Sequence, residues 1–393
     1  RSLPYAKPIL VLTVAVIAIS GYGISQININ DNPVRWFKPS HKIRVADDVL
    51  NRELAGTYMA FLVMKQDTDA EKEIVAAGDA ALEGTDDGFQ ATWDTLKTEA
   101  RTESEAGDTT VVDALIEKTS DLSFDTTGDQ SALWQSVQTA LEEAQTQTKT
   151  FQNPEHLAYI ERLQQEAEAL PLVGKTSSIA DVVKTVYREL ISGEDADFRI
   201  PDTTEGVAQT LLQFQSSHRP NDLWHLVSPD YRESAVWVQL KSGDNQDMMA
   251  VKTDLDAYLA ANPPPEGLRA EWAGLTYLNV VWQEEMVGGM LESLMGAFVI
   301  VFLMMMILFR SPVYGLLAMV PLTITIVLTY GLIGLIGKDY DMPVAVLSSL
   351  TLGLSVDFAI HFLERARAIQ SETGDWTETM RLMFQEPGRA ITR

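Results

Sequence analysis

Four stretches of the chain are long, apolar and almost free of charge, and they constrain its fold more than any other feature. No charged residue occurs in residues 8–30, 293–309 or 311–337, and residues 342–363 contain a single acid. A helix of about 20 apolar residues spans the roughly 30 Å hydrocarbon core of a bilayer. The sequence therefore predicts membrane-spanning helices within residues 1–30 and 292–363, and the chain is not one soluble globule.

These stretches are also compatible with two other interpretations. The first stretch has basic residues before it and small residues within it, as in a cleaved signal peptide. Its charge-free run is longer than the usual signal-peptide core of about 7 to 15 residues, which favours a retained helix. The later three stretches are also compatible with buried helices of a large soluble core. Three such helices would leave almost no polar surface for water, which favours a membrane.

The acidic residues are concentrated between the first two apolar stretches. The chain has a net charge of -25, and residues 30–291, with 46 acids and 21 bases, carry all of it. A strongly acidic surface repels the phosphate backbone, so nucleic acid is excluded as a partner. The chain has no cysteine and only five histidines, which excludes disulfides and thiolate metal sites and argues against any metal centre.

The basic residues next to the predicted spans indicate their orientation. Cytoplasmic loops carry an excess of Lys and Arg. If the four spans alternate, one side receives Arg1, Lys7, Arg310, Arg365, Arg367, Arg381, Arg389 and Arg393. That side is predicted to be cytoplasmic, and residues 31–291 and 338–341 to be outside.

The outer block, residues 31–291, is predicted to be an α+β domain with one helical face. Strands 234–240 and 268–273, joined by helix 248–259, form a β-α-β unit whose crossover is expected to put the second strand beside or near the first. The other elements expected from apolar spacing are helices 43–54, 153–170, 179–190 and 204–215 and strand 58–64.

Residues 66–150 differ from the rest of this block. They contain 20 acids and five bases, and high charge with low hydrophobicity favours disorder. However, apolar residues recur there at helical spacing. These residues are Phe89, Trp93, Leu133, Trp134, Val137 and Leu141. The segment is therefore predicted to be a mobile, mainly helical insertion.

The fourth apolar stretch contains the residues with the clearest potential chemistry. Asp357 lies 15 residues after Met342, or roughly 22 Å along a helix, in the inner half of the bilayer. A carboxylate there costs about 2.5 to 3.5 kcal/mol, and it is tolerated where it faces the bundle interior, has a partner or takes up a proton. Since burial raises the pKa of a carboxyl group, Asp357 is a candidate proton carrier.

Residues at intervals of four place a polar stripe next to this acid. Ser349, Gly353, Asp357 and His361 share one helix face. Gly353, Ser355 and His361 are candidate supporting residues. The alternative is structural: Asp357 holds a hydrogen-bond network, His361 is an ordinary interfacial residue, and Ser355 serves helix packing.

Three motifs resemble those of the resistance-nodulation-division (RND) superfamily, in the MMPL and sterol-sensing-like branch that includes hopanoid exporters. The motifs are Asp31-Asn32-Pro33-Val34-Arg35-Trp36-Phe37 after the first span, Phe309-Arg310-Ser311-Pro312 at the inner turn, and Gly353-Leu354-Ser355-Val356-Asp357-Phe358-Ala359-Ile360-His361 in the fourth span. The resemblance implies that Asp357 is the proton-carrying aspartate and that residues 153–291 match part of the porter domain. Several relatives have Tyr where this chain has Phe358.

The resemblance also implies a larger protein. The chain is expected to be the N-terminal half of an exporter, with residues 364–393 forming a cytoplasmic amphipathic segment before a fifth span. Its expected partners are a lipid-like or other hydrophobic substrate, membrane lipids and the C-terminal half with further spans and partner acids. A second copy and a periplasmic protein are left open as partners. The expected location is the bacterial inner membrane, with the large domain in the periplasm.

The predicted function is export of lipids or other hydrophobic compounds, with protons as the coupling ion and no other cofactor. Movement is expected to pass through the helix of residues 282–309, with Gly288 and Gly289 as a hinge. No Walker, HExxH or nucleophile-elbow motif occurs, so the chain is predicted not to be an enzyme. Two alternatives are a lipid-sensing or scaffolding membrane protein that does not pump, and an accessory protein of polypeptide translocation.

Overall fold

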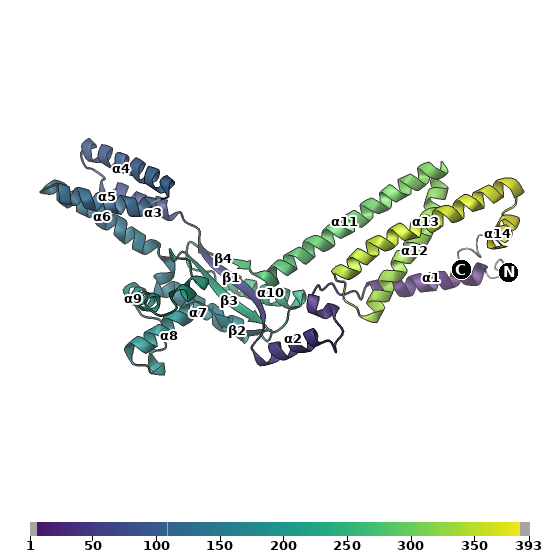
Figure 1. The fold of residues 1–393 in the computed structure, drawn as a ribbon, viewed down its shortest axis with the longest axis horizontal. Helices are drawn as coiled ribbons and strands as arrows, with labels where there is room; N and C mark the ends of the chain where they lie inside the picture. The colour runs from purple at the N-terminus through teal and green to yellow at the C-terminus, as the bar shows by residue number, and fades with distance from the viewer. Residues whose placement is uncertain (1–5, 108, 386–393) are drawn as a thin grey trace. The chain divides into compact units, whose positions relative to one another are not determined.

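The structure is a computed structural model that describes residues 6–107 and 109–385. Residues 6, 291, 347–356, 384 and 385 are described by their backbone alone. The chain is mostly helical, with one small sheet, and its contacts divide it into two compact units (Figure 1). The helical unit comprises residues 1–47, 243–248 and 278–393, and the sheet unit comprises residues 48–242 and 249–277.

The helical unit contains the long apolar helices. They are α1 (Ala6–Ile24), α11 (Leu275–Phe309, which begins in the sheet unit), α12 (Pro312–Ile336) and α13 (Met342–Thr373), followed by the short α14 (Trp376–Gln385). Among the described residues, α1, α11 and α12 are long and apolar enough to cross a membrane, as predicted. The fourth span stays a prediction, because the side chains of residues 347–356 lie outside the description.

Small residues bring α1 and α12 into close contact. A Cβ added at Gly23 would lie 2.1 Å from the carbonyl oxygen of Gly331, and one added at Gly331 would lie 2.4 Å from the Cα of Ser20. At Gly334 the same atom would lie 1.8 Å from the carbonyl oxygen of Gly23. Glycine thus allows the two backbones to touch, as in many membrane helix pairs. Gly337 ends α12 in the left-handed conformation that favours glycine.

Apolar side chains join the remaining helices of this unit. Met305 and Phe309 of α11 pack against Ala318 of α12 and Ala359 of α13. Two further clusters join α11 to α12 and α13 to α14. Their buried members are Met319 and Leu322 in the first, and Ala366, Ile369 and Met383 in the second.

The turn between α11 and α12 explains the Phe-Arg-Ser-Pro motif. The Arg367 guanidinium of α13 donates a 2.7 Å hydrogen bond to the carbonyl oxygen of Phe309, which α11 leaves without an intrahelical partner. The same guanidinium lies 5.4 Å from the centre of the Tyr314 ring. Arg310 adopts a positive φ of 49°, and Pro312 occupies the first turn of α12, where its missing N–H is not needed.

The sheet unit is built on four antiparallel strands in the order β2-β3-β1-β4. They are β1 (Tyr58–Gln66), β2 (Val173–Ser177), β3 (Glu233–Leu240) and β4 (Leu268–Ala273). The expected β-α-β unit is present in a split form: β3 and β4 are joined by α10 (Asn245–Ala261) and are parallel to each other, with β4 near β3 rather than beside it. Both strands pair with β1, so that Leu62 lies opposite Val236 on one side and Trp272 on the other. The long apolar β1 lies between β3 and β4 and forms backbone hydrogen bonds with both.

Helices of the sheet unit lie close to their predicted positions. α7 (Pro154–Ala169), α8 (Ile179–Ile191) and α9 (Thr204–Gln215) were predicted within one residue at each end. The other elements are α2 (Lys42–Glu53) and α10 (Asn245–Ala261), each of which begins in the helical unit, and the short helices η2 (Pro33–Trp36, in the helical unit), η3 (Thr150–Gln152), η4 (Asp195–Asp197) and η5 (Pro220–His225). Strand β2 was not predicted, because five residues of mixed polarity carry little periodicity.

The acidic insertion is helical and has its own core. It contains α3 (Ala70–Ala81), α4 (Asp87–Ala106), α5 (Val111–Asp125) and α6 (Asp129–Thr148). The predicted anchors are confirmed: Trp93, Trp134, Val137 and Leu141 are buried, and Phe89 packs against them from the edge. The mobility of the insertion stays a prediction.

Candidate functional site

Helix α13 presents the predicted proton carrier on an open face. Asp357 and His361, one helical turn apart, are both exposed. Ala359 and Ala366, on the other side of the helix, are buried against α11, α12 and α14. The backbone of Gly353 and Ser355 belongs to α13, but their side chains lie outside the described residues, so their supporting role stays a prediction. The structure brings Asp357 and His361 together on one face.

The other end of α13 is held by a buried carboxylate. Asp341 is 2% exposed and caps the helix, because its Oδ1 accepts a 3.1 Å hydrogen bond from the backbone N of Val344. Its second oxygen forms an ion pair with Lys338. A carboxylate at a helix N-terminus satisfies a free N–H and interacts favourably with the helix dipole. The N-terminus of α13 is therefore stabilised by a cap and an ion pair.

The Asp-Asn-Pro motif after α1 connects this end of α13 to α11. The backbone N of Asp31 donates a 2.8 Å hydrogen bond to Oε1 of Gln283 in α11. The Oδ1 of Asp31 accepts from Nε1 of Trp36 at 3.3 Å and from the backbone N of Met342, the first residue of α13, at 3.4 Å. One buried residue thus links the segment after α1 to two other helices.

A second buried acid completes what we call the junction network, the bonded group formed by residues 28–36, 244–246, 283 and 338–342. Nδ2 of Asn32 donates a 2.7 Å hydrogen bond to Oδ1 of Asp244, and the Arg35 guanidinium pairs with the other oxygen. The backbone N of Asn245 donates to Oδ1 of Asn30 at 3.0 Å. Asp244 is 6% exposed and Asn245 is 1% exposed.

Sequence reasoning identified the Asp-Asn-Pro motif as a turn signal and through a resemblance, but it missed the partners of the motif. Asp244 and Asn245 stand just before a predicted helix and look like ordinary N-terminal capping residues. Gln283 lies among the polar residues Asn279, Glu284 and Glu285 at the start of α11, so nothing in the sequence singled it out. Among the described residues, no group of His, Asp or Glu is placed to hold a metal ion.

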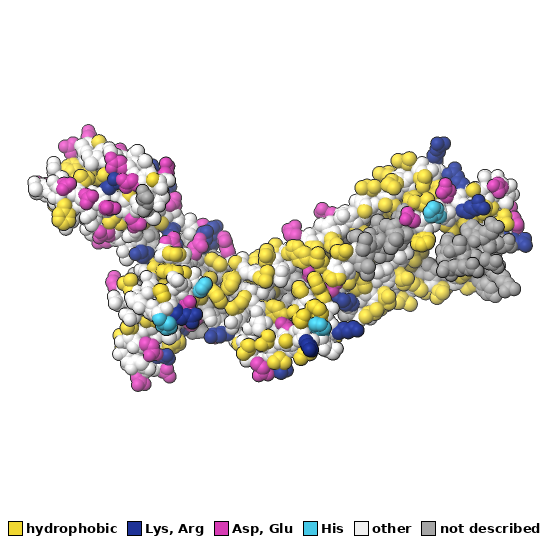
Figure 2. Space-filling view, in the orientation of Figure 1, with side chains coloured by type: hydrophobic (Ala, Val, Ile, Leu, Met, Phe, Trp, Pro, Cys, Tyr) yellow, Lys and Arg dark blue, Asp and Glu magenta, His cyan; other side chains and the backbone are white. Residues whose placement is uncertain are grey.

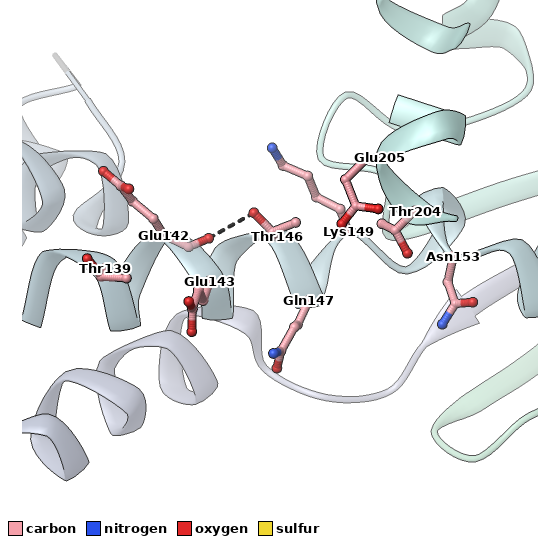
Figure 3. Close-up of a pocket in the computed structure, with 9 residues that line it drawn as sticks. All are labelled: Thr139, Glu142, Glu143, Thr146, Gln147, Lys149, Asn153, Thr204 and Glu205. Atoms are coloured by element: carbon pink, nitrogen blue, oxygen red, sulfur yellow. Dashed lines mark hydrogen bonds between the residues drawn. The ribbon is translucent and has the colours of Figure 1, made fainter. Parts of the chain in front are cut away.

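A cavity of about 560 Å³ in the sheet unit lies between the end of α6 and the start of α9 (Figure 3). Its lining residues are polar or charged: Thr139, Glu142, Glu143, Thr146, Gln147, Lys149, Asn153, Thr204 and Glu205. Sites for hydrophobic ligands are lined mainly by apolar and aromatic side chains. This cavity is therefore a poor fit for a lipid.

Comparison with known proteins places these features in a family. The sequence profile of the MMPL family matches residues 59–393. A protein of Methanocaldococcus jannaschii, whose name describes it only as a candidate membrane protein, is 24% identical over 167 residues. That match covers 42% of this chain and 42% of the relative, so the aligned region is less than half of either protein.

Proposed function

The chain belongs to the MMPL family, and from that premise we propose that it transports lipids or other hydrophobic compounds by an RND-type mechanism driven by protons. Its long apolar helices are those of a membrane protein. The proposed location is the bacterial inner membrane, with the sheet unit in the periplasm. We propose no enzymatic role and no cofactor apart from the coupling proton.

The observation that carries the proposal is the position of Asp357 on the open face of α13. The opposite face of the helix packs against its neighbours, whereas Asp357 and His361 are exposed. A carboxylate in contact with lipid chains is costly, so this face needs further helices or a water path. The proposed C-terminal half of the transporter supplies the partner groups and completes this environment.

The proposed cycle uses the charge of Asp357 as its switch. Protonation from outside neutralises the carboxylate, the helices then shift, and release of the proton to the cytoplasm resets them. Helix α11 is continuous from Leu275 in the sheet unit to Phe309, so it is the proposed route for the movement. A Cβ added at Gly288 or Gly289 would meet no atom within 4 Å. Packing therefore does not require glycine there, which supports the hinge role.

The test compares Asp357→Asn with the unaltered full-length protein that contains this chain. Efflux of the hydrophobic dye N-phenylnaphthylamine is measured from inverted or right-side-out vesicles with an imposed proton gradient. We expect the variant to lose gradient-driven efflux, because Asn cannot carry a proton, and Asp357→Glu to retain part of it. Full efflux by the Asn variant would rule out this role. Dye binding without gradient-driven movement would favour a lipid sensor instead.

A further inference from the structure

The segment that follows the junction network has a composition unlike the acidic block around it. Residues 32–46 contain Arg35, Lys38, Lys42 and Arg44 and no acid, within a block that has more than twice as many acids as bases. Arg35 pairs with Asp244 in the junction network. Lys38 and Lys42 are exposed and take part in no ion pair among the described residues. Two positive charges are thus free at this surface.

Large apolar side chains lie next to these charges and are exposed as well. Trp36 is 44% exposed, Phe37 38%, Ile43 48% and Leu50 43%. The last two lie on one side of α2, whereas Asp48 and Arg52 lie on the other. Figure 2 shows hydrophobic and basic side chains next to one another over this helix. An amphipathic helix that carries Lys and Arg and is preceded by aromatic residues is typical of membrane surfaces.

The junction network places this segment at the level where the apolar helices end. The backbone N of Tyr340 donates a 2.7 Å hydrogen bond to the carbonyl oxygen of Asn28, and Nη1 of Arg35 lies 4.0 Å from Asp339. Residues 338–341 join the end of α12 to the start of α13 and so mark the boundary of the apolar helices. Trp36 directly follows Arg35 and is held there by its hydrogen bond to Asp31.

The local structure of the segment is also organised before α2 begins. The rings of Phe37 and His41 stack with their centres 4.5 Å apart. Nη1 of Arg44 donates a 3.4 Å hydrogen bond to the carbonyl oxygen of Phe37, and the backbone N of His41 donates to that of Lys38 at 2.8 Å. These contacts hold the turn that carries the two free lysines, so their charges stay beside the exposed aromatic residues.

We propose that residues 36–50, the docking segment, bind the bilayer surface at this end of the apolar helices and recognise anionic lipid headgroups. Trp36 and Phe37 enter the interfacial layer, where aromatic side chains are favoured, and the apolar side of α2 lies on the acyl boundary. Lys38 and Lys42 contact headgroup phosphates. The proposal concerns a second lipid contact of the chain, apart from the transported compound, and does not depend on the proton mechanism.

The absence of cysteine from this chain makes a direct test simple. Single cysteines replace Ile43, Leu50 or, as the matched control on the opposite side of α2, Asp48. Each variant is labelled with an environment-sensitive fluorophore in phosphatidylcholine vesicles with and without phosphatidylglycerol. Brominated lipids report contact with acyl chains. We expect quenching at Ile43→Cys and Leu50→Cys in the anionic vesicles and none at Asp48→Cys.

The double variant Lys38→Gln/Lys42→Gln, carrying the Ile43→Cys label, tests the charges. Since each Lys near an anionic surface favours binding by a factor of about five, the bound-to-free ratio should fall by roughly 25-fold. Equal quenching with and without phosphatidylglycerol would overturn the anionic-lipid assignment. Labels that remain in water in both kinds of vesicle would overturn the proposal that the docking segment binds the bilayer. Labels that are shielded by a second copy or by another part of the protein would overturn it as well.

Discussion

Two carboxylates on the same helix have opposite surroundings. Asp341, at the start of α13, is buried, caps the helix and forms an ion pair with Lys338. Asp357, four turns further along, is exposed on the face that does not pack against α11 or α12. Asp341 therefore finds its hydrogen-bond and ion-pair partners within this chain. Asp357 lies on an open face, where a change of its charge can alter what the helix contacts.

This difference separates a structural end of the bundle from a functional face. Asp31 and Asp244 belong to the same class as Asp341, because both are buried and bonded to donors from other segments. Removing a donor or acceptor from such a group leaves its partner unsatisfied, which is costly. Asp357 has no such partner among the residues that the structure describes. Substitutions at the two kinds of site should therefore separate stability from transport.

The largest loss of stability is expected at the contact between α1 and α12. Gly23→Leu would force a side chain against the backbone of Gly331, where even a Cβ lies 2.1 Å from the carbonyl oxygen. We expect the variant to lose about 3 kcal/mol or more of the free energy of unfolding, since neither backbone can yield. Thermal unfolding in detergent measures the loss. Gly21→Leu is the control, because a Cβ at Gly21 meets nothing within 4 Å, and an equal loss in both variants would contradict the close contact.

The next largest effect is expected in the junction network. Asp244→Asn removes the ion pair with Arg35. It also replaces the carboxylate that accepts from the Asn32 side chain by an amide, which has one accepting and one donating end. We expect a loss of about 2 kcal/mol, below the range for fully buried pairs because the Arg35 side chain is 45% exposed. Chemical unfolding of the reconstituted protein measures it. Asp254→Asn, at an exposed acid of α10 that forms no ion pair among the described residues, is the control and should cost clearly less.

The sequence predicted the elements better than it predicted their contacts. Helical spacing located α7, α8, α9 and the buried tryptophans of the insertion, because periodicity is a local property. The pairing of β4 with β1 and the bonds from Asp31 to Gln283 and Met342 join residues more than 200 positions apart. No local pattern encodes such partners. Asp357 could be singled out because an acid within an apolar stretch is unusual by itself.

A smaller effect is expected at Asp79 in the insertion. This acid is intermediate between the buried, bonded acids and the exposed Asp357. Burial raises the pKa of this carboxyl, but hydrogen bonds from Trp93 Nε1 at 2.6 Å and Lys97 at 3.0 Å outweigh that effect and lower the pKa below its ordinary value. Because the folded pKa is the lower one, the stabilisation is present above pH of about 4 and is lost as the pH falls through the folded pKa. Since the side chain is 51% exposed, Asp79→Asn should cost only about 0.5 kcal/mol.

Tryptophan fluorescence during unfolding at neutral and at acidic pH follows this contribution. The variant and the unaltered protein should differ at neutral pH and converge in acid, where Asp79 is protonated in both folded and unfolded chains. Lys72→Gln in the same insertion is a control for a general change of charge, and it should leave the pH profile of the difference unchanged. A difference that grows as the pH falls would contradict the direction of the pKa shift.

The smallest effect on stability is expected at Asp357, which makes it the sharpest test of the comparison. The side chain is exposed, so Asp357→Asn leaves no described donor unsatisfied and should change the free energy of unfolding by no more than about 0.5 kcal/mol. Transport should nevertheless be lost, because the amide cannot exchange a proton. The same unfolding measurement used for Asp244→Asn compares the two sites directly. If Asp357→Asn destabilised the protein as much as Asp244→Asn, Asp357 would be a structural residue like Asp341, and a loss of transport in that variant would no longer identify a proton carrier.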